Sequence, residues 1–298
     1  MEGLTGLLLG GYWDSQGVLH REFELAMLTG REEELLAQGR RTEAASLVTA
    51  VLSRGVRRLG TISPVTEDIV RDFLVADRQY LLLKLRQFTF GDVVRASVFC
   101  PCPDCGRRVS LEFAIDDVPV EEARERAPQF TLTLSRDALG EEDASEREVH
   151  FRLPNGADQE VVSPLLEENE AAALSLLLRR AIRRIGSVAT TDTDSLSTLS
   201  SLARAEIEAE MERVAPRVEL TMDTACAECG RGFAVPFDLH RLFFGELRTD
   251  SDLLYREVHY LAYHYHWGEG EIMAMPRDKR QKYVALLADE IDRLNDGD

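Results

Sequence analysis

The sequence has 298 residues, and its 53 acidic and 35 basic side chains give a formal net charge of −18. Apolar residues make up 44% of the chain and charged residues 30%, a mixture typical of a globular protein and unlike a collagen, a disordered tail or a disulfide-rich miniprotein. The negative charge argues against duplex DNA as a partner, because affinity for DNA depends largely on cations placed against phosphates.

The acidity is concentrated in one region. Residues 112–170 hold 17 Asp and Glu side chains against 5 Arg. No stretch approaches the 18 apolar residues of a membrane span, and the N-terminus has neither the basic nor the long apolar region of a signal peptide. We therefore expect a cytoplasmic protein with no membrane span, in which five cysteines do not form a disulfide framework.

The N-terminal third is predicted to hold a hairpin followed by helices. Residues 1–28 form the hairpin, with its turn at 14–17. Thr29 and Glu32 then have the spacing of a capping box at the start of a helix. Apolar residues at helical spacing predict further helices over about 42–59 and 66–88.

The rest of the chain alternates between predicted strands and helices. Strands are expected at 93–99, 109–115, 218–222 and 233–237, and a further hairpin from 130–134 and 148–153. Helices are expected over about 165–185, before Pro216, over about 250–267, and from near Pro276 onward.

The cysteines give the strongest chemical signal. The segments Cys100-Pro101-Cys102-Pro103-Asp104-Cys105-Gly106 and Cys226-Ala227-Glu228-Cys229-Gly230 each contain a C-x-x-C pair followed by glycine. A tight turn of this kind directs two thiolates toward one metal, and glycine permits the left-handed backbone that the turn needs. Two such pairs complete a closed tetrahedral site, so we predict a structural zinc ion (Zn²⁺) bound by Cys102, Cys105, Cys226 and Cys229.

Two alternatives stay open at the cysteines. Cys100 could replace Cys102 as a ligand or remain free beside the site, and all five cysteines could be thiols that bind no metal. A redox pair is less favoured because no thioredoxin-like βαβ pattern surrounds either C-x-x-C. Four protein ligands would leave no open position for catalysis on the metal.

The spacing of the two pairs predicts an insertion. A compact ribbon separates its pairs by roughly 15–20 residues, whereas residues 116–216 intervene here. We therefore expect an α+β fold, mostly helical, with a discontinuous four-cysteine zinc-ribbon-like β module that carries a large α/β insertion. The expected parts are 1–92 (hairpin and helices), 93–115 with 217–240 (ribbon-like module), 116–216 (acidic insertion) and 241–298 (C-terminal helices).

Catalytic patterns are weak. His259, His264 and His266 lie close in sequence, but on a helix His264 and His266 diverge, and only His259 and His266 share a face. The chain has no H-E-x-x-H, no G-x-S-x-G and no phosphate-binding G-x-x-x-x-G-K-[ST] pattern. An aromatic packing helix is the simpler interpretation of the histidine segment, and we do not expect an enzyme.

Several segments, in order over roughly 20–290, resemble T-even-type phage baseplate proteins of the baseplate hub assembly chaperone family. This family occurs in contractile phage tails and phage tail-like contractile injection systems. The segments are Leu28-Thr29-Gly30-Arg31-Glu32-Glu33-Glu34, Leu81-Leu82-Leu83-Lys84-Leu85-Arg86, Thr89-Phe90-Gly91-Asp92, Cys102-Pro103-Asp104-Cys105-Gly106, Phe151-Arg152-Leu153-Pro154-Asn155-Gly156-Ala157-Asp158, Glu257-Val258-His259, Tyr265-His266-Trp267 and Glu271-Ile272.

The resemblance implies a non-catalytic assembly or structural component of a baseplate. Its partners would be hub, spike or wedge proteins of a contractile tail-like particle, into which the chain itself could be incorporated. The first alternative is a zinc-ribbon module that binds nucleic acid or a transcription complex, since Arg107, Arg108 and Arg231 flank the cysteine pairs. The second is a metal-dependent hydrolase that uses His259 and His266.

Overall fold

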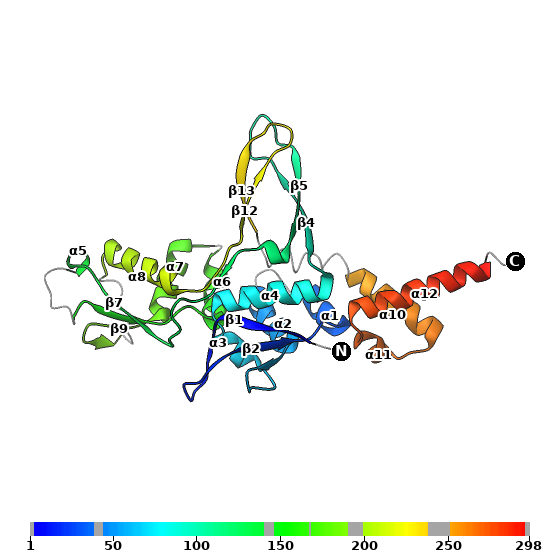
Figure 1. Ribbon diagram of the computed structural model, residues 1–298, viewed down its shortest axis with the longest axis horizontal. Helices are drawn as coiled ribbons and strands as arrows, with labels where there is room; N and C mark the ends of the chain where they lie inside the picture. Colours follow the sequence, from blue (N-terminus) through cyan, green and yellow to red (C-terminus); the bar gives the residue numbers. More distant parts are fainter. Residues whose placement is uncertain are drawn as a thin grey trace.

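A computed structural model describes residues 3–38, 44–139, 146–166, 168–189, 199–237 and 251–295. The chain has a mixed α/β fold (Figure 1). A central core occupies the middle of the molecule, and an arm of strands projects from it. A second sheet with its helices lies at one end of the core, and the C-terminal helices lie at the other. No described helix is both long and apolar enough to cross a bilayer.

The N-terminal hairpin is confirmed. Strand β1 (Leu4–Trp13) pairs antiparallel with β2 (Leu19–Leu25). Helix α1 (Gly30–Gln38) follows, and only one of the two bonds of the expected capping box forms, the one from the Thr29 N–H to the Glu32 side chain. The Thr29 backbone N–H donates to Glu32 Oε2 at 2.9 Å, and the Arg31 N–H points to Thr29 Oγ1 at 3.4 Å.

The helix expected over 42–59 is too long. Helix α2 covers Ala44–Gly55, and strand β3 (Val56–Leu59) follows it at once. Strand β3 pairs with β2 and completes a three-stranded sheet of order β1-β2-β3. Val56 and Leu59 are buried. Residues 56–59, which the helical spacing predicts to be part of the helix, instead pair with the open edge of β2.

The helix expected over 66–88 is two helices. Helix α3 (Glu67–Asp72) ends at Phe73, and α4 (Val75–Phe90) begins after Leu74. The peptide groups at the break are used elsewhere: the Val75 N–H donates to the Pro154 carbonyl at 3.2 Å, and the Phe73 carbonyl accepts from the Gly156 N–H at 3.0 Å. A contact distant in sequence therefore breaks the helix at a point where local spacing shows no break.

Helix α4 packs along β1, and the main core lies between the sheet, α2 and α4. Several polar groups are buried within this core, among them Thr49, Asp77 and Arg78. The Arg78 side chain is 1% exposed and donates to Thr49 Oγ1 at 2.9 Å, to the Ala45 carbonyl at 2.8 Å and to the Val70 carbonyl at 3.1 Å. Burial lowers the pKa of Arg78 to about 10.

A second sheet lies between the two cysteine groups in sequence. It is antiparallel, of order β10-β9-β8-β7, and the hairpin expected at 130–134 and 148–153 is confirmed as two of its strands. Its own apolar core lies between the sheet and its helices. The strands are β7 (Phe130–Thr133), β8 (Glu148–Phe151), β9 (Ile182–Ile185) and β10 (Val188–Ala189), and the helices are α5 (Arg136–Leu139), α6 (Gly156–Leu166), α7 (Glu170–Ala181) and α8 (Ser201–Val214).

The helix expected over 165–185 is wrong in both bounds. Helix α6 begins already at Gly156, and Asn169 starts a separate helix α7, because its side chain accepts from the Ala172 N–H at 3.0 Å. Residues 182–185 leave the helix to pair with β8. The helix expected before Pro216 is confirmed as α8.

The C-terminal region is helical as expected. It contains α10 (Ser251–Tyr265), α11 (Glu269–Met273) and α12 (Arg277–Asn295), around a small apolar cluster that includes Leu261 and Ile272. Residues 238–250, which hold the boundary expected at 240/241, lie outside the described residues.

A buried ion-pair network joins the C-terminal helices to α1. Arg280 is 1% exposed; it donates to both Glu33 carboxylate oxygens at 2.9 and 3.0 Å and to Glu257 Oε2 at 2.7 Å. Burial raises the pKa of Glu33, and the charge of Arg280 opposes that shift. This guanidinium is the buried centre of the contact, and the Tyr255 hydroxyl bond to Glu34 and the Arg277–Glu33 pair add to it.

Replacing Arg280 with methionine should destabilise this contact by about 3–5 kcal/mol, because two carboxylates lose their buried cation. Urea unfolding measures the loss, and hydrogen exchange should show it concentrated in α10–α12. Arg293→Met is the matched control, since that side chain is 76% exposed and its pair with Glu290 is 3.5 Å long. Equal stability of the two variants would contradict this role for Arg280.

Gly156→Ala should destabilise the core by about 1–3 kcal/mol through overpacking. A Cβ atom there would lie 2.3 Å from Arg78 Nη1 and 2.7 Å from its Cζ, and three hydrogen bonds hold that guanidinium in place. Thermal melting measures the effect. Gly270→Ala, where no atom lies within 4 Å of the added carbon, should leave the melting temperature nearly unchanged.

Candidate metal centre

The cysteines lie at the far end of the projecting arm. The arm consists of residues 93–114 and 221–236, and Figure 1 shows its two hairpins standing side by side above α4. The first hairpin pairs β4 (Val93–Phe99) with β5 (Arg108–Ala114), and the second pairs β12 (Thr221–Ala225) with β13 (Gly232–Pro236). The strands expected at 93–99, 109–115 and 233–237 are confirmed with small shifts of their bounds. The strand expected at 218–222 is instead divided between β11 (Arg217–Val218) and β12, with residues 219 and 220 in neither.

Side chains alternate along the arm, as the pleat of a strand requires. One face of the first hairpin holds Val94, Ala96, Val98, Val109, Leu111 and Phe113, and the matching face of the second holds Met222, Thr224, Phe233 and Val235. Of these ten residues only Val94 and Phe113, near the base, are buried, and the others are half-buried. Phe99, on the opposite face, is 75% exposed.

Two contacts fix the base of the arm. The rings of Phe113 and Phe237 meet edge to face, with centroids 5.2 Å apart. Just below, the short strands β6 (Val120–Glu121) and β11 (Arg217–Val218) pair antiparallel. Both ends of the segment that holds the second sheet are therefore brought together at the base of the arm.

Four of the five cysteines converge at the tip. The sulfur atoms of Cys100, Cys105, Cys226 and Cys229 all lie within 4.8 Å of one another. The Sγ atoms of Cys100 and Cys229 are 3.7 Å apart, and those of Cys105 and Cys226 are 3.8 Å apart. Disulfide sulfurs would be about 2.05 Å apart, so these are four free thiols arranged as one group.

Backbone N–H groups at the tip point toward the sulfurs. Those of Cys229 and Glu228 lower the pKa of Cys226 to about 7, whereas at Cys100 and at Cys105 such N–H groups are outweighed by burial and the neighbouring thiols, which raise the pKa. Binding of a metal would displace the protons of these thiols, because the thiolate is the form that binds a metal. The group can therefore hold a metal ion, and its four protein ligands would close a tetrahedral site.

Each glycine that follows a cysteine pair has the backbone expected of it. Gly106 and Gly230 have φ angles of 54° and 70°. The Gly106 N–H donates to the Cys102 carbonyl at 3.1 Å, and the Gly230 N–H donates to the Cys226 carbonyl at 2.8 Å. These bonds form the two tight turns.

The structure places Cys100, and not Cys102, with Cys105, Cys226 and Cys229. Cys100 directly follows β4, and its N–H still pairs across the hairpin with the Arg107 carbonyl at 2.8 Å. It therefore continues the alternation of Val94, Ala96 and Val98 toward the second hairpin. Cys102 lies two residues on, inside the turn, and is half-buried outside the group of four.

The sequence did contain a signal for Cys100. The repeated C-x-x-C-Gly pattern makes Cys102 the counterpart of Cys226. The alternation of inward-facing side chains along β4, however, continues to Cys100. The Cys226 N–H bonds to the carbonyl five residues ahead, and the Cys100 N–H to the carbonyl seven ahead. The first turn is thus two residues longer than the second. For this reason the cysteine that faces the second hairpin is Cys100, which lies outside the C-x-x-C pair.

The histidine helix forms no comparable group. His259 lies against Tyr263, and His264 packs edge to face on Tyr260 and Tyr263. His266 follows the end of α10 with a positive φ of 58°. Within the described ranges, the cysteine group is the only cluster of three or more His, Cys, Asp and Glu ligands close enough to hold a metal.

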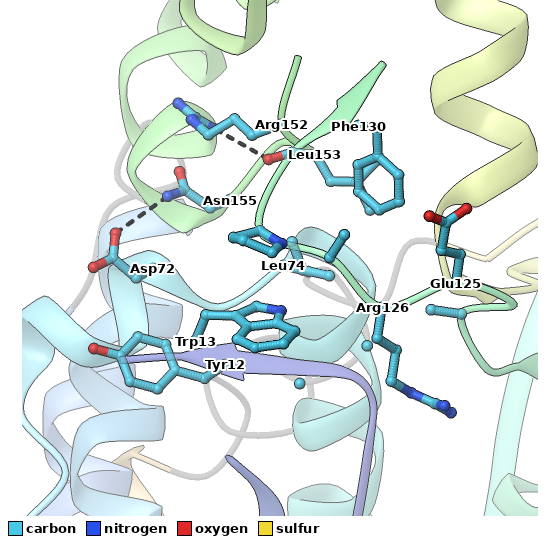
Figure 2. Close-up of a pocket in the computed structure, with 15 residues that line it drawn as sticks. Tyr12, Trp13, Asp72, Leu74, Glu125, Arg126, Phe130, Arg152, Leu153 and Asn155 are labelled. Atoms are coloured by element: carbon cyan, nitrogen blue, oxygen red, sulfur yellow. Dashed lines mark hydrogen bonds between the residues drawn. The ribbon is translucent and has the colours of Figure 1, made fainter. Parts of the chain in front are cut away.

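A pocket of about 200 Å³ lies where the second sheet meets the core (Figure 2). Trp13 and Phe130 contribute aromatic walls, and Asp72 and Asn155 lie at one side. The Asn155 amide donates to Asp72 Oδ1 at 3.2 Å, and Arg152 donates to the Leu153 carbonyl at 3.0 Å. The Asn155–Asp72 bond joins the two parts of the chain to each other, and we interpret the pocket as a structural junction.

Comparison with known families gives two matches. Residues 18–244 match a family model described as T4 bacteriophage base plate protein. Residues 247–298 match a family of unknown function, DUF6760. No curated protein and no solved structure matches the chain. The boundary between the two families separates the C-terminal helices from the core, the arm and the second sheet.

Asp158, which holds Arg152 beside the pocket, should make stability depend on acid pH. Its carboxylate is fully buried and accepts from Arg152, from Arg180 at 2.7 Å and from the Asn155 N–H at 3.0 Å. Burial alone would raise its pKa, but these hydrogen bonds outweigh burial and lower it. The stabilisation is thus present above the ordinary aspartate pKa and is lost as pH falls through the lowered value.

Asp158→Asn should therefore lower stability at neutral pH by about 3–5 kcal/mol, because two arginines lose a buried anion. It should also flatten the fall in stability between about pH 5 and pH 2. Urea unfolding over this pH range measures both effects. Glu208→Gln, an exposed change on α8, should keep the wild-type profile, and an unchanged profile in Asp158→Asn would contradict the assignment.

Proposed function

The chain belongs to the family of T4 bacteriophage base plate proteins, and we propose that it is a non-catalytic structural or assembly component of a contractile tail-like baseplate. The observation that carries this proposal is the family match over residues 18–244, which includes the core, the arm and the second sheet. Partners of such a component are other baseplate proteins. Those we propose are hub, spike or wedge subunits, bound through protein–protein contacts.

The shape of the molecule supports a role in holding other subunits. The arm stands away from the body, and the C-terminal helices and the second sheet extend from opposite ends of the core (Figure 1). A molecule of this shape offers contact surfaces in several directions. The fold of the C-terminal helices rests on apolar and ionic packing, and their histidines lie among tyrosine rings, which supports a structural role for that region.

We further propose that the arm is a zinc-ribbon-like module into which residues 116–216 are inserted. The pairing of β6 with β11 supports this division, because it brings the two ends of the segment together beneath the arm. A long closed loop costs only slightly more conformational entropy than a medium one, so such an insertion is physically acceptable.

Zinc is the metal that we propose for the tip. Four thiolates favour a soft or borderline ion such as zinc over magnesium or calcium, which prefer oxygen ligands. With its four positions filled by protein, the ion would stabilise the fold and take no part in catalysis. We propose that the chain is made in the cytoplasm and joins the tail-like particle there, either permanently or as a transient assembly chaperone.

Co-expression with candidate hub, spike and wedge proteins tests the baseplate role. A tagged form of the full chain should retain at least one of them through affinity purification and gel filtration. An unrelated protein of similar size and net charge serves as the control, because −18 charges could retain basic proteins without specificity. Failure to retain any partner, together with normal particle assembly when the chain is deleted, would refute the proposal.

A further inference from the structure

The arm has an unusual distribution of contacts along its length. Near the base Val94 and Phe113 of the first hairpin are buried, and the Phe113–Phe237 contact and the β6–β11 pair hold the hairpins together. Toward the tip the inner residues are only half-buried. The hairpins also form two separate two-stranded sheets, with no strand of one paired to a strand of the other.

Such an arm needs a further link at its far end. An isolated two-stranded hairpin is at best marginally stable in water, and the half-buried side chains near the tip add little apolar area. The four cysteines lie at this end, and they link the hairpins in pairs: Cys100 lies against Cys229, and Cys105 against Cys226. Each close pair thus joins the first hairpin to the second.

We propose that one metal ion, bound by the thiolates of Cys100, Cys105, Cys226 and Cys229, clamps the tip of the arm and fixes its two hairpins to each other. Cys102 is not a ligand. The inference deepens the structural metal of the proposed function, on which it rests: it names the ligand set and assigns the metal a mechanical role across 121 positions of sequence.

The sulfur geometry fits this ligand set. Zinc–sulfur bonds of about 2.3 Å in a tetrahedron place neighbouring sulfurs about 3.8 Å apart. The two hairpin-to-hairpin pairs measure 3.7 and 3.8 Å, and no pair among the four exceeds 4.8 Å. The sulfurs therefore need only small side-chain adjustments to close around an ion.

The surroundings of Cys100 and Cys226 fit the same set. These two residues are 4% and 2% exposed, whereas Cys105 is half-buried and Cys229 lies on the exposed side of the group. Cys100 and Cys226 both continue the inward parity of their strands, β4 and β12. Cys102 instead supplies the carbonyl that accepts the N–H groups of Cys105 and Gly106. Its backbone shapes the turn, and a serine there keeps that carbonyl.

Loss of the ion should open the arm without unfolding the body. The core and the second sheet each have their own apolar cluster, and neither depends on the tip. Binding of the metal would instead order the distal halves of β4, β5, β12 and β13. The orientation of the tip, including the exposed Phe99 ring, would then follow metal occupancy.

Paired serine variants of the full chain test the ligand set. Cys100→Ser and Cys102→Ser are purified alongside the wild type, and zinc content is measured by plasma mass spectrometry. The wild type and Cys102→Ser should each hold about one ion per chain. Cys100→Ser should lose affinity by more than the about 10–100-fold caused by loss of a group outside the coordination sphere. Cobalt substitution should give the visible and thiolate charge-transfer bands of a tetrahedral four-thiolate site in the wild type and in Cys102→Ser, but not in Cys100→Ser.

Hydrogen exchange of the full chain tests the clamp. Removal of zinc by a chelator should increase exchange in residues 93–99, 108–114, 221–225 and 232–236, and leave that of α4 and β8 unchanged. Cys100→Ser should exchange in the same way without a chelator. Unchanged α4 and β8 would show that the body of the variant is still folded.

Each contrary outcome would refute a different part of the proposal. Equal zinc content in Cys100→Ser and Cys102→Ser, or loss in Cys102→Ser alone, would overturn the ligand set. An arm equally protected with and without zinc would overturn the clamp. A wild type that binds no metal would remove the structural metal itself. The baseplate role is tested separately by partner retention, so it can stand or fall without these results.

Discussion

The arrangement of the molecule depends on the backbone contact between residues 73–75 and 154–156. Hydrogen bonds from Val75 to Pro154 and from Gly156 to Phe73 break the long apolar helix and attach the second sheet to the core. Gly156 is required here because the buried guanidinium of Arg78 occupies the space that a Cβ would fill. Asp158, two residues later, holds Arg152 and Arg180. The two backbone hydrogen bonds and the Asn155–Asp72 bond therefore fix one part of the chain against the other, and the Asp158 pairs hold the segment around residues 152–180 together.

This contact also determines where the arm stands. The chain leaves the core through β4 and β5, builds the second sheet, and returns through β11 to form β12 and β13. Because the second sheet is held at 154–156, its two connections can meet as β6 and β11 beneath the arm. The contacts at the base hold the two hairpins in position there. Farther from the base, fewer contacts fix the hairpins relative to each other. Metal ligation, which we propose for the tip, is a short-range and directional interaction, and it would supply order where the apolar contacts end.

Local patterns in the sequence predicted local features well. The hairpin of β1 and β2, the capping bond from Thr29 to Glu32, and the strands of the arm depend on residues close together in the chain. The errors share one cause. Residues 56–59 and 182–185 have helical neighbours but join the open edges of β2 and β8, and residues 73–74 break a helix to bind a segment 80 residues away. Pairing partners that are distant in sequence determine the structure of these segments, and a single sequence does not reveal those partners. At the tip, the convergence of Cys105, Cys226 and Cys229 agrees with their motif, whereas the position of Cys100 beside them depends on the length of a turn.

The C-terminal helices are attached by a different kind of contact. They match a family of their own, yet the guanidinium of Arg280 is buried between Glu33 of α1 and Glu257 of α10. A buried ion pair adds little stability compared with apolar packing, since desolvation offsets much of its attraction. It is specific, however, because any other docking position would leave a buried charge without its partner. In the C-terminal helices, small apolar contacts thus provide proximity, and a few directional polar bonds select one orientation. The metal that we propose at the tip would act on the arm by the same principle. Both attachments would let a baseplate component present its surfaces in fixed directions where packing is thin.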